Sequence, residues 1–445
     1  MTRGYLRTLA VAMGLALAAG SASAASRATL FQNVRIFDGR GGALSAPSNV
    51  LVVDGAIARI SSAPITSELA PEIIEGGGRT LMPGLIDAHW HAMLIRPNPA
   101  QAIDGDIGYN NIVAAAEATD TLMRGFTTVR DVGGPVFGLK RAIDEGLVAG
   151  PRIYPSGAMI TVTSGHGDFR QLNELPRTGD HLARMEQIGG SAVADSPDEV
   201  RRRVREQLMQ GASQVKLTAG GGVSSPFSPV DVSTFTDGEL TAATEATSNW
   251  GTYVTAHAFT SVAIQRSINA GVKVIEHGFL MDEATAKLIA AKGVWLSLQP
   301  LPEALREGFP PGSVQRQGAD EVWPGIDRTY QLAKKYKIKT AWGTDVLFSQ
   351  ALAQQQGAIL VSLNRWYEPA EVLAMATSVN AELLALSGPR NPYPGKLGVV
   401  AEGALADLLL IDGDPLTNLN LIADPAKNIV VIMKGGKTYK NTISR

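Results

Sequence analysis

Residues 81–91, LMPGLIDAHWH, place a Pro-Gly turn before a short apolar run that ends in two histidines one residue apart. On a strand, His89 and His91 would point to the same face, because side chains alternate with a period of two. Two neutral imidazoles side by side suit a dication such as Zn²⁺. Two histidines can equally be packed in a core without metal, so this stretch alone leaves both interpretations open.

The composition indicates a globular chain, with 45% hydrophobic and 18% charged residues among 445. The net charge is −2 and no basic stripe is visible, so we expect neither nucleic acid nor an anionic membrane surface as a partner. The chain has no cysteine, which excludes disulfides, thiolate zinc sites and iron–sulfur clusters. Any metal must therefore be held by His, Asp, Glu or an unusual ligand.

The N-terminus predicts a secretory signal peptide over residues 1–24. Arg3 and Arg7 precede the apolar run 9–20, and Ala22-Ser23-Ala24 is a small-residue cleavage site. An uncleaved anchor is the alternative, but a membrane span needs about 20 apolar residues and this run is shorter. We therefore expect an exported protein, periplasmic or secreted, with no membrane attachment after cleavage.

The middle of the chain alternates strand-like and helical segments, which predicts a (β/α)8 TIM barrel over residues 83–392. Ser196 and Thr236 are suitable helix N-caps, and Glu239 stands in the capping-box position of the second. The expected helices include 111–125, 196–211, 236–251 and 282–293. The expected strands are 84–91, 126–133, 152–160, 213–221, 252–259, 272–278, 293–300 and 338–345.

The two ends of the chain have a different pattern of short β-like runs with turns between them. We predict one small β-sandwich built from residues 25–82 and 393–445, and the alternative is two unrelated β extensions.

Four of the six histidines, together with one aspartate, fall at ends of predicted barrel strands. His89 and His91 end the first strand, and His257, His277 and Asp345 end later ones. The carboxyl ends of barrel strands meet at one face, where active sites of this fold lie. The later residues therefore favour the metal interpretation of the pair.

Lys216 lies in an otherwise apolar strand. Near metal ions its pKa should fall, and the neutral amine can then add CO₂ to form a carbamate that bridges two metals. The alternative is a lysine that extends from the strand end into solvent.

The series His-x-His, Lys, His, His and Asp resembles that of the amidohydrolase superfamily, over about residues 28–441. The segments LMPGLIDAHWH and GALADLLLIDGDP (403–415) resemble its sandwich–barrel junction. TSGHGD (163–168), VKLTAGGGVSS (215–225) and IEHG (275–278) are similar to its imidazolonepropionase-like branch. Within that branch they resemble the Xaa-Pro dipeptidase and carboxypeptidase group, which includes ochratoxin-hydrolysing amidases.

The resemblance implies two divalent metal ions, most simply Zn²⁺, and assigns their ligands. His89, His91 and Asp345 would hold one ion, His257 and His277 the other, and N6-carboxylated Lys216 would bridge them. Two such ions activate water and polarise the scissile carbonyl, and Asp345 would carry the proton to the leaving amine.

Three further residues concern the substrate or the surface. The resemblance implies that His166 faces the substrate, and the alternative is a loop histidine that caps a backbone group. Phe259 would form a pocket wall where we expect Tyr or His in many relatives. His181 is expected at the surface. Residues 220–222, GGG, lack the GK[ST] continuation of a phosphate loop.

The expected function is a binuclear metal-dependent amidohydrolase that cleaves a peptide-like amide and releases an amino acid. Dipeptides and N-acyl amino acids such as ochratoxin A fit as small-molecule substrates, and the resemblance implies a homo-oligomer, plausibly an octamer. One alternative is a cyclic-amide hydrolase, imidazolonepropionase- or hydantoinase-like. Another is a non-catalytic binding protein on a barrel that has lost its activity.

Overall fold

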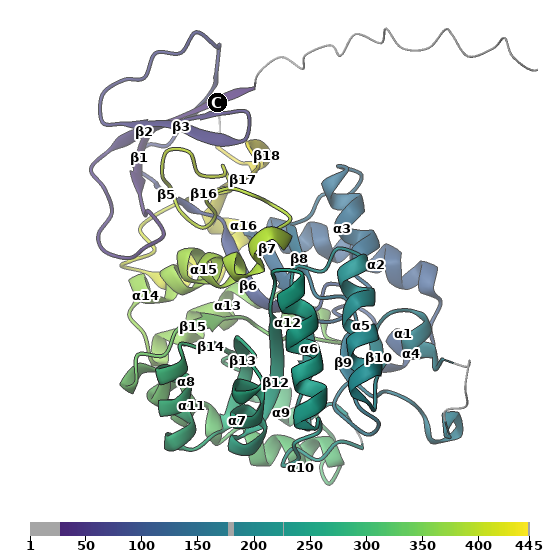
Figure 1. The fold of residues 1–445 in the computed structure, drawn as a ribbon. Coiled ribbons are helices and arrows are strands. Elements are labelled where there is room, and N and C mark those ends of the chain that lie inside the picture. The colour runs from purple at the N-terminus through teal and green to yellow at the C-terminus, as the bar shows by residue number, and fades with distance from the viewer. Residues whose placement is uncertain (1–26, 177–181, 226, 444–445) are drawn as a thin grey trace, which may run out of the picture.

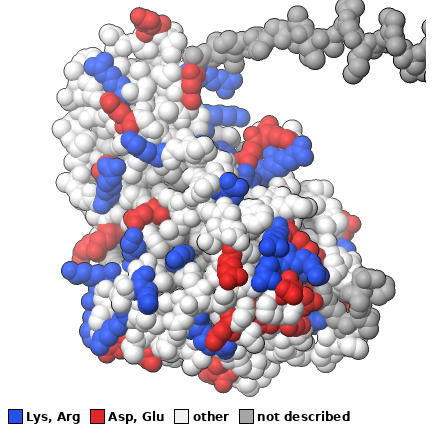
Figure 2. Space-filling view, in the orientation of Figure 1, with Lys and Arg blue, Asp and Glu red and all other residues white. Residues whose placement is uncertain are grey.

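The computed structural model describes residues 27–176, 182–225 and 227–443. It has two regions (Figure 1). Strands from both chain ends form a sheet at one side, and the middle of the chain forms parallel strands surrounded by helices. The predicted signal peptide (1–24) and His181 lie outside the described residues. On the face in Figure 2, basic and acidic side chains are interspersed.

One mixed sheet combines the N-terminal and C-terminal strands, in the order β18-β17-β16-β5-β1-β2-β3, with β4 paired to β1. Leu81 of β5 is opposite Leu410 of β16 in an antiparallel pair, which joins the two chain ends. Both side chains are buried in a core of this sheet with Phe31 and Val431. The strands are β1 (Ala28–Ile36), β2 (Ser48–Val53), β3 (Ala56–Ser61), β4 (Glu72–Glu75), β5 (Thr80–Pro83), β16 (Leu408–Ile411), β17 (Ile429–Lys434) and β18 (Lys437–Asn441).

The parallel strands of the middle region form a three-stranded sheet, β6-β7-β8, and a seven-stranded sheet, β10-β9-β11-β12-β13-β14-β15. They are fully buried along most of their length, as expected for strands covered by helices. Their bounds are β6 (Leu85–Trp90), β7 (Phe126–Asp131), β8 (Arg152–Pro155), β9 (Met159–Thr161), β10 (Ser191–Val193), β11 (Val215–Thr218), β12 (Val254–Thr260), β13 (Val274–Leu280), β14 (Trp295–Leu298) and β15 (Thr340–Trp342).

Two helices begin where the capping signals place them, whereas the helix expected over 111–125 begins earlier, at Ile107. The Ser196 side chain accepts a hydrogen bond from the Glu199 amide, and Thr236 and Glu239 form a capping box. Bounds are α1 (Pro99–Asp104), α2 (Ile107–Met123), α3 (Phe137–Asp144), α4 (Arg184–Gln187), α5 (Pro197–Met209), α6 (Asp237–Asn249), α7 (Ser261–Asn269), α8 (Glu283–Lys292), α9 (Glu303–Glu307), α10 (Val314–Val322), α11 (Gly325–Lys335), α12 (Gln350–Ala353), α13 (Gln356–Val361), α14 (Pro369–Ala374), α15 (Asn380–Leu384) and α16 (Pro425–Asn428).

The eight predicted barrel strands do not form one continuous ladder in the described residues. The run 152–160 divides into β8, which pairs with β7, and β9, which pairs with β11. The short strand β10 also pairs with β9 and was not expected. Beside the break between β8 and β9, the Ser213 amide donates to the Pro155 carbonyl at 2.8 Å. This hydrogen bond from a loop residue stands where a ladder hydrogen bond between strands is absent.

A second gap lies between β15 and β6, where Asn380 connects the two strands. Its side-chain amide donates to the Ile86 and Trp342 carbonyls, both at 2.8 Å, and its oxygen accepts from the Trp342 amide at 3.0 Å. Nearby, the Asp345 amide donates to the His89 carbonyl at 2.9 Å. These bonds satisfy backbone groups that would otherwise be buried without partners.

One helical stretch, Pro369–Arg390, is long and apolar enough to cross a membrane by length and composition. It contains α14, α15 and the short turns η3 (Met375–Val379) and η4 (Ala385–Arg390). In its most apolar window 56% is buried inside the molecule, and Val372 and Leu383 lie in the core. Core helices of globular proteins share this pattern.

We predict that Asn380→Ala lowers the free energy of unfolding by about 2–3 kcal/mol, because it leaves buried backbone groups without partners. Chemical denaturation measures the change. Asn111→Ala, at an exposed position of α2, is the control and should change stability by less than about 0.5 kcal/mol. Equal stabilities of the two variants would contradict the role given to Asn380.

Candidate metal centre

The histidines predicted at strand ends lie together. The ring centroids of His89 and His277 are 5.0 Å apart, those of His257 and His277 4.6 Å, and those of His89 and His91 5.4 Å. His89 lies in β6, His257 in β12 and His277 in β13, while His91 directly follows β6. All four side chains are buried, at 1–3% exposure. Four imidazoles, from the end of β6, from β12 and from β13, therefore meet at one place.

Asp345 completes a group of possible metal ligands with two of these histidines. Its Oδ1 is 3.2 Å from Nε2 of His89 and 3.3 Å from Nε2 of His91. One ligand atom each from His89, His277 and Asp345 lies within 4.8 Å of the others. Carboxylate and imidazole are common ligands of divalent ions such as Zn²⁺.

His89 and His91 each use Nδ1 for a hydrogen bond to the surrounding protein, which leaves Nε2 for a metal. Nδ1 of His89 is 2.7 Å from Oε2 of Glu276, and Nδ1 of His91 is 2.9 Å from the Gly133 carbonyl. Both partners only accept, which favours the neutral tautomer with its proton on Nδ1 and leaves Nε2 of each ring directed at Asp345. Lone pairs and a carboxylate oxygen that converge this closely fit a cation between them.

The second histidine pair also has one nitrogen occupied by an acceptor. Nε2 of His257 donates to the Gly221 carbonyl at 2.7 Å, which leaves Nδ1 as the possible ligand. Nδ1 of His277 is 2.7 Å from Oε1 of Gln299, which leaves Nε2. A carbonyl or carboxylate behind each imidazole is the usual arrangement around metal-binding histidines.

Burial keeps most of these histidines neutral, as metal ligands must be. It lowers the pKa of His91, lowers that of His257 well below its ordinary value, and lowers that of His277 to about 3. At His89 burial also acts to lower the pKa, but Asp345 and Glu276 outweigh it and raise the pKa. A proton on Nε2 of His89, or a cation held at the same point, would balance the negative charge of Asp345.

Lys216, in β11, is 2% exposed and lines one cavity together with these four histidines and Asp345. Burial lowers its pKa and outweighs the carboxylates of Glu276 and Asp345, which act to raise it; the positive charge of Arg130 acts in the same direction as burial. Both effects favour the neutral amine, which is the form that reacts with CO₂.

The structure reveals two buried carboxylates behind His89 that the sequence analysis missed. Glu276 accepts from His89 and from Nη2 of Arg130, at 2.6 Å. Asp87 accepts from the His89 amide at 3.0 Å and from the Thr344 hydroxyl at 2.7 Å. They fix the ring and backbone of His89. Their only sequence signal was a charged residue inside an apolar strand.

The glycine run 220–222 has a structural role at the site. The Gly221 carbonyl accepts from His257, and a Cβ on Gly222 would lie 2.0 Å from Nδ1 of His166. Gly222 therefore leaves the space that the His166 ring occupies.

His166 lies against the metal-ligand candidates, with its ring centroid 4.3 Å from that of His257. Its Nδ1 is 3.0 Å from Oγ of Ser225, which also accepts from the Gly167 amide at 3.0 Å. The Ser225 hydroxyl can then donate to Nδ1 of His166. This favours the tautomer of His166 that carries its proton on Nε2, where it can donate a hydrogen bond. Burial lowers the pKa of His166 to about 4, so its imidazole is neutral.

Two residues of the candidate centre have unusual backbone angles. His277 has φ 72° and Asp345 has φ 54°, in the left-handed region that favours glycine. Such conformations are concentrated at functional sites, where the surrounding structure imposes them.

The candidate metal ligands and His166 line a cavity of about 510 Å³. Phe259 forms part of its wall and packs edge-on against His257, with ring centroids 4.7 Å apart. The volume is in the usual range of small-molecule sites.

A comparison with protein families identifies the chain: the model described as the amidohydrolase family matches residues 80–439. The chain belongs to the amidohydrolase family. Ochratoxinase from Aspergillus niger is 29% identical over 393 residues, which cover 81% of this chain and 75% of that protein.

Solved structures agree with this membership. A crystal structure of an amidohydrolase has a TM-score of 0.86 and 35% identity, covering 94% of this chain and 100% of that one. A prolidase complexed with N-methylphosphonate-L-proline has a TM-score of 0.84 and 32% identity, covering 93% of this chain and 100% of that one. These neighbours imply a TIM barrel with an additional domain.

The chain is therefore a hydrolase that acts on amide bonds, in a family whose members are generally metal-dependent. The alternative of a non-catalytic binding protein is set aside.

We predict that Glu276→Gln weakens Zn²⁺ binding about 10- to 100-fold, because His89 loses its charged partner. Competition with a chromophoric chelator measures the affinity. Glu245→Gln, at an exposed position, is the control and should bind as the parent does. Unchanged affinity in Glu276→Gln would refute the positioning role.

We also predict that Gly222→Ala lowers kcat/KM about 100-fold while the bound metal content stays the same, because it displaces His166. Gly138→Ala is the control, since a Cβ there meets no atom within 4 Å. Parental activity in Gly222→Ala would show that the position of His166 is unimportant.

Proposed function

We propose that this chain is a binuclear, zinc-type amidohydrolase that cleaves a peptide-like amide bond and releases an amino acid. The observation that carries the proposal is the convergence of Nε2 of His89 and Nε2 of His91 on Oδ1 of Asp345, at 3.2 and 3.3 Å. Two imidazoles and a carboxylate that converge on one buried point suit a divalent cation.

The residues divide into two ligand groups. His89, His91 and Asp345 would hold one ion through Nε2, Nε2 and a carboxylate oxygen. His257 and His277 would hold the second, and the carbamate of Lys216 would join the two. When bound, such ions activate water and polarise the substrate carbonyl.

The chain's own residues perform the remaining steps. Asp345 accepts the proton of the attacking water on a carboxylate oxygen and returns it to the leaving amine nitrogen. Asp345 starts as the anion: burial acts to raise its pKa, but the neighbouring His89 and His91 hold it well below its ordinary value. His166, as a neutral donor, orients the carbonyl or the carboxylate of the substrate.

The substrate class follows from the relatives. One is named an ochratoxinase, and ochratoxin A is an N-acyl amino acid; another is a prolidase complexed with N-methylphosphonate-L-proline, an N-substituted amino acid. We therefore propose dipeptides and N-acyl amino acids as the substrates of this chain, with Phe259 in the pocket wall.

Four properties of the whole protein are part of the proposal. The parallel strands make the (β/α)8 barrel of residues 83–392, and residues 25–82 with 393–445 make a β-sandwich. The protein is exported after cleavage behind Ala24, and it assembles as a homo-oligomer, plausibly an octamer. N-terminal sequencing of exported protein and light scattering test the last two properties.

We predict that purified protein contains about two zinc equivalents per chain and releases amino acid from a panel of dipeptides and N-acyl amino acids. Removal of metal by a chelator should abolish turnover, and added Zn²⁺ should restore it. Ring amides in the same panel test the cyclic-amide alternative.

For Lys216 we expect native mass spectrometry to detect the added mass of one CO₂, and Lys216→Ala to lose this mass and at least about 100-fold in kcat. Undiminished activity of Lys216→Ala, or full activity of metal-free protein, would overturn the proposed mechanism.

A further inference from the structure

We infer that the site selects N-acylated substrates with a bulky aromatic acyl group over free dipeptides of the same size. This inference rests on the proposed function and specifies its substrate class. It follows from what lines the cavity and from which charged groups near the cavity already have partners.

The wall of the cavity is largely apolar and contains five rings of Phe and Trp. Its rings come from the loop that holds His166, from β12, from the segment after β14 and from the loop after β15: Phe169, Phe259, Phe309, Trp323 and Phe348. Leu301, Leu305 and Leu352 fill the spaces between them. An apolar group of the substrate that enters this wall is removed from water, which favours large aromatic groups.

Charged side chains are scarce in the same wall. Among the described residues that line the cavity, Asp345 is the single carboxylate, and Lys216 is the single lysine or arginine. Asp345 is already engaged by His89 and His91, and it is the proposed proton carrier. The α-ammonium of a dipeptide would therefore enter an apolar site without a free counter-charge, which is costly.

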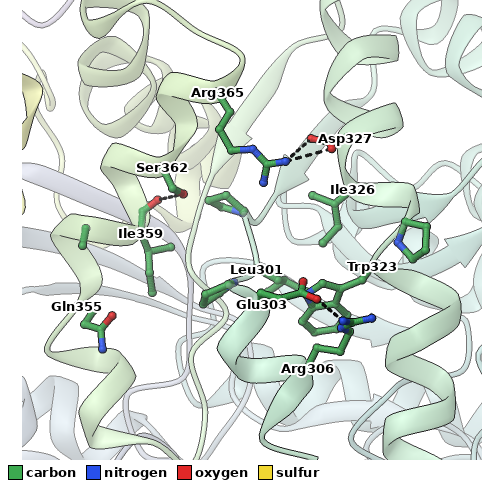
Figure 3. Close-up of a pocket in the computed structure, with 14 residues that line it drawn as sticks. Leu301, Glu303, Arg306, Trp323, Ile326, Asp327, Gln355, Ile359, Ser362 and Arg365 are labelled. Atoms are coloured by element: carbon green, nitrogen blue, oxygen red, sulfur yellow. Dashed lines mark hydrogen bonds and ion pairs between the residues drawn. The ribbon is translucent and has the colours of Figure 1, made fainter.

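Two acidic side chains beside the cavity, Glu303 and Asp168, are also occupied. Figure 3 shows a neighbouring cavity of about 440 Å³ that shares Leu301 and Trp323 with this one. There Glu303 pairs with Arg306. Next to Phe169, Asp168 pairs with Arg170 at 2.6 Å. Neither carboxylate is free to receive an ammonium group.

The neutral polar groups of the pocket suit the other end of the substrate. His166 and Ser224 line the cavity and can donate hydrogen bonds to the carboxylate of the amino acid that is released. An ammonium group has no lone pair and cannot accept them. The pocket therefore discriminates between the two charged ends of a dipeptide.

A matched pair of substrates tests the inference: 3-phenylpropanoyl-L-phenylalanine and L-phenylalanyl-L-phenylalanine. They share a carbon skeleton and a carboxylate and differ only in the α-ammonium group. At neutral pH we expect kcat/KM to favour the compound without the ammonium at least about tenfold. Equal values, or a preference for the dipeptide, would overturn the inference.

Binding provides a second measurement that does not depend on turnover. Calorimetric titration of metal-depleted protein should give a dissociation constant at least about tenfold lower for 3-phenylpropanoyl-L-phenylalanine than for the dipeptide. Equal dissociation constants would contradict the role assigned to the pocket wall.

The aromatic wall is tested by Phe309→Ala, a half-buried position whose truncation leaves the core intact. It should lower the ratio of kcat/KM for the 3-phenylpropanoyl compound to that for N-acetyl-L-phenylalanine about tenfold. Leu147→Ala, 76% exposed and outside the cavity lining, is the control and should leave the ratio unchanged. A ratio in Phe309→Ala equal to that of the control would refute acyl selection by the wall.

The three substrates distinguish a failure of the proposed function from a failure of the inference alone. If metal-loaded protein hydrolyses none of these three compounds, the proposed function itself is overturned, and the inference with it. If it hydrolyses the dipeptide and the N-acyl compound equally well, the proposed function stands and the inference alone is wrong.

Discussion

The hydrogen bond from the Asp345 amide to the His89 carbonyl, 2.9 Å long, is the contact on which the rest of the site depends. It joins the chain after β15 to the end of β6, where the two strands share no ladder. The same two residues then face each other through a carboxylate oxygen and an imidazole nitrogen. The gap between the parallel sheets and the candidate metal centre are therefore one structural feature. Asn380 supports it from one side, and Asp87, through Thr344, from the other.

Buried charge is the energetic cost of this arrangement. Glu276 and Arg130 have no exposed surface, and each would be destabilising without the other. Glu276 divides its two oxygens between Arg130 and His89, so the ion pair also orients a metal-ligand candidate. The positive φ values of His277 and Asp345 add local strain at the same place. Stability is given up where function requires fixed side chains.

Sequence reasoning succeeded where the signal is local. Ser196 and Thr236 were predicted as N-caps from adjacent residues, and the structure has them there. Apolar runs also located the strands of His257 and His277, although these strands do not end at the histidines but continue to Thr260 and Leu280. The same kind of run located Lys216 and Asp345, which line one cavity with these histidines. Hydropathy and capping are encoded within a few positions, so these features can be predicted from one sequence.

Sequence reasoning failed where a feature depends on contacts between residues that are far apart in the sequence. The break between β8 and β9 depends on pairing with different neighbours, and the role of Glu276 depends on a residue 187 positions away. The purpose of Gly222 appears only when His166 lies over it. No local pattern encodes these relations, because they exist only after the strands have assembled.

Anomalous X-ray diffraction at the zinc edge, on crystals of zinc-loaded protein, would locate the metal ions of the proposed centre. We expect two peaks, one between His89, His91 and Asp345 and one beside His257 and His277, with Lys216 between them. A single peak elsewhere, or no zinc among these residues, would contradict the proposed centre.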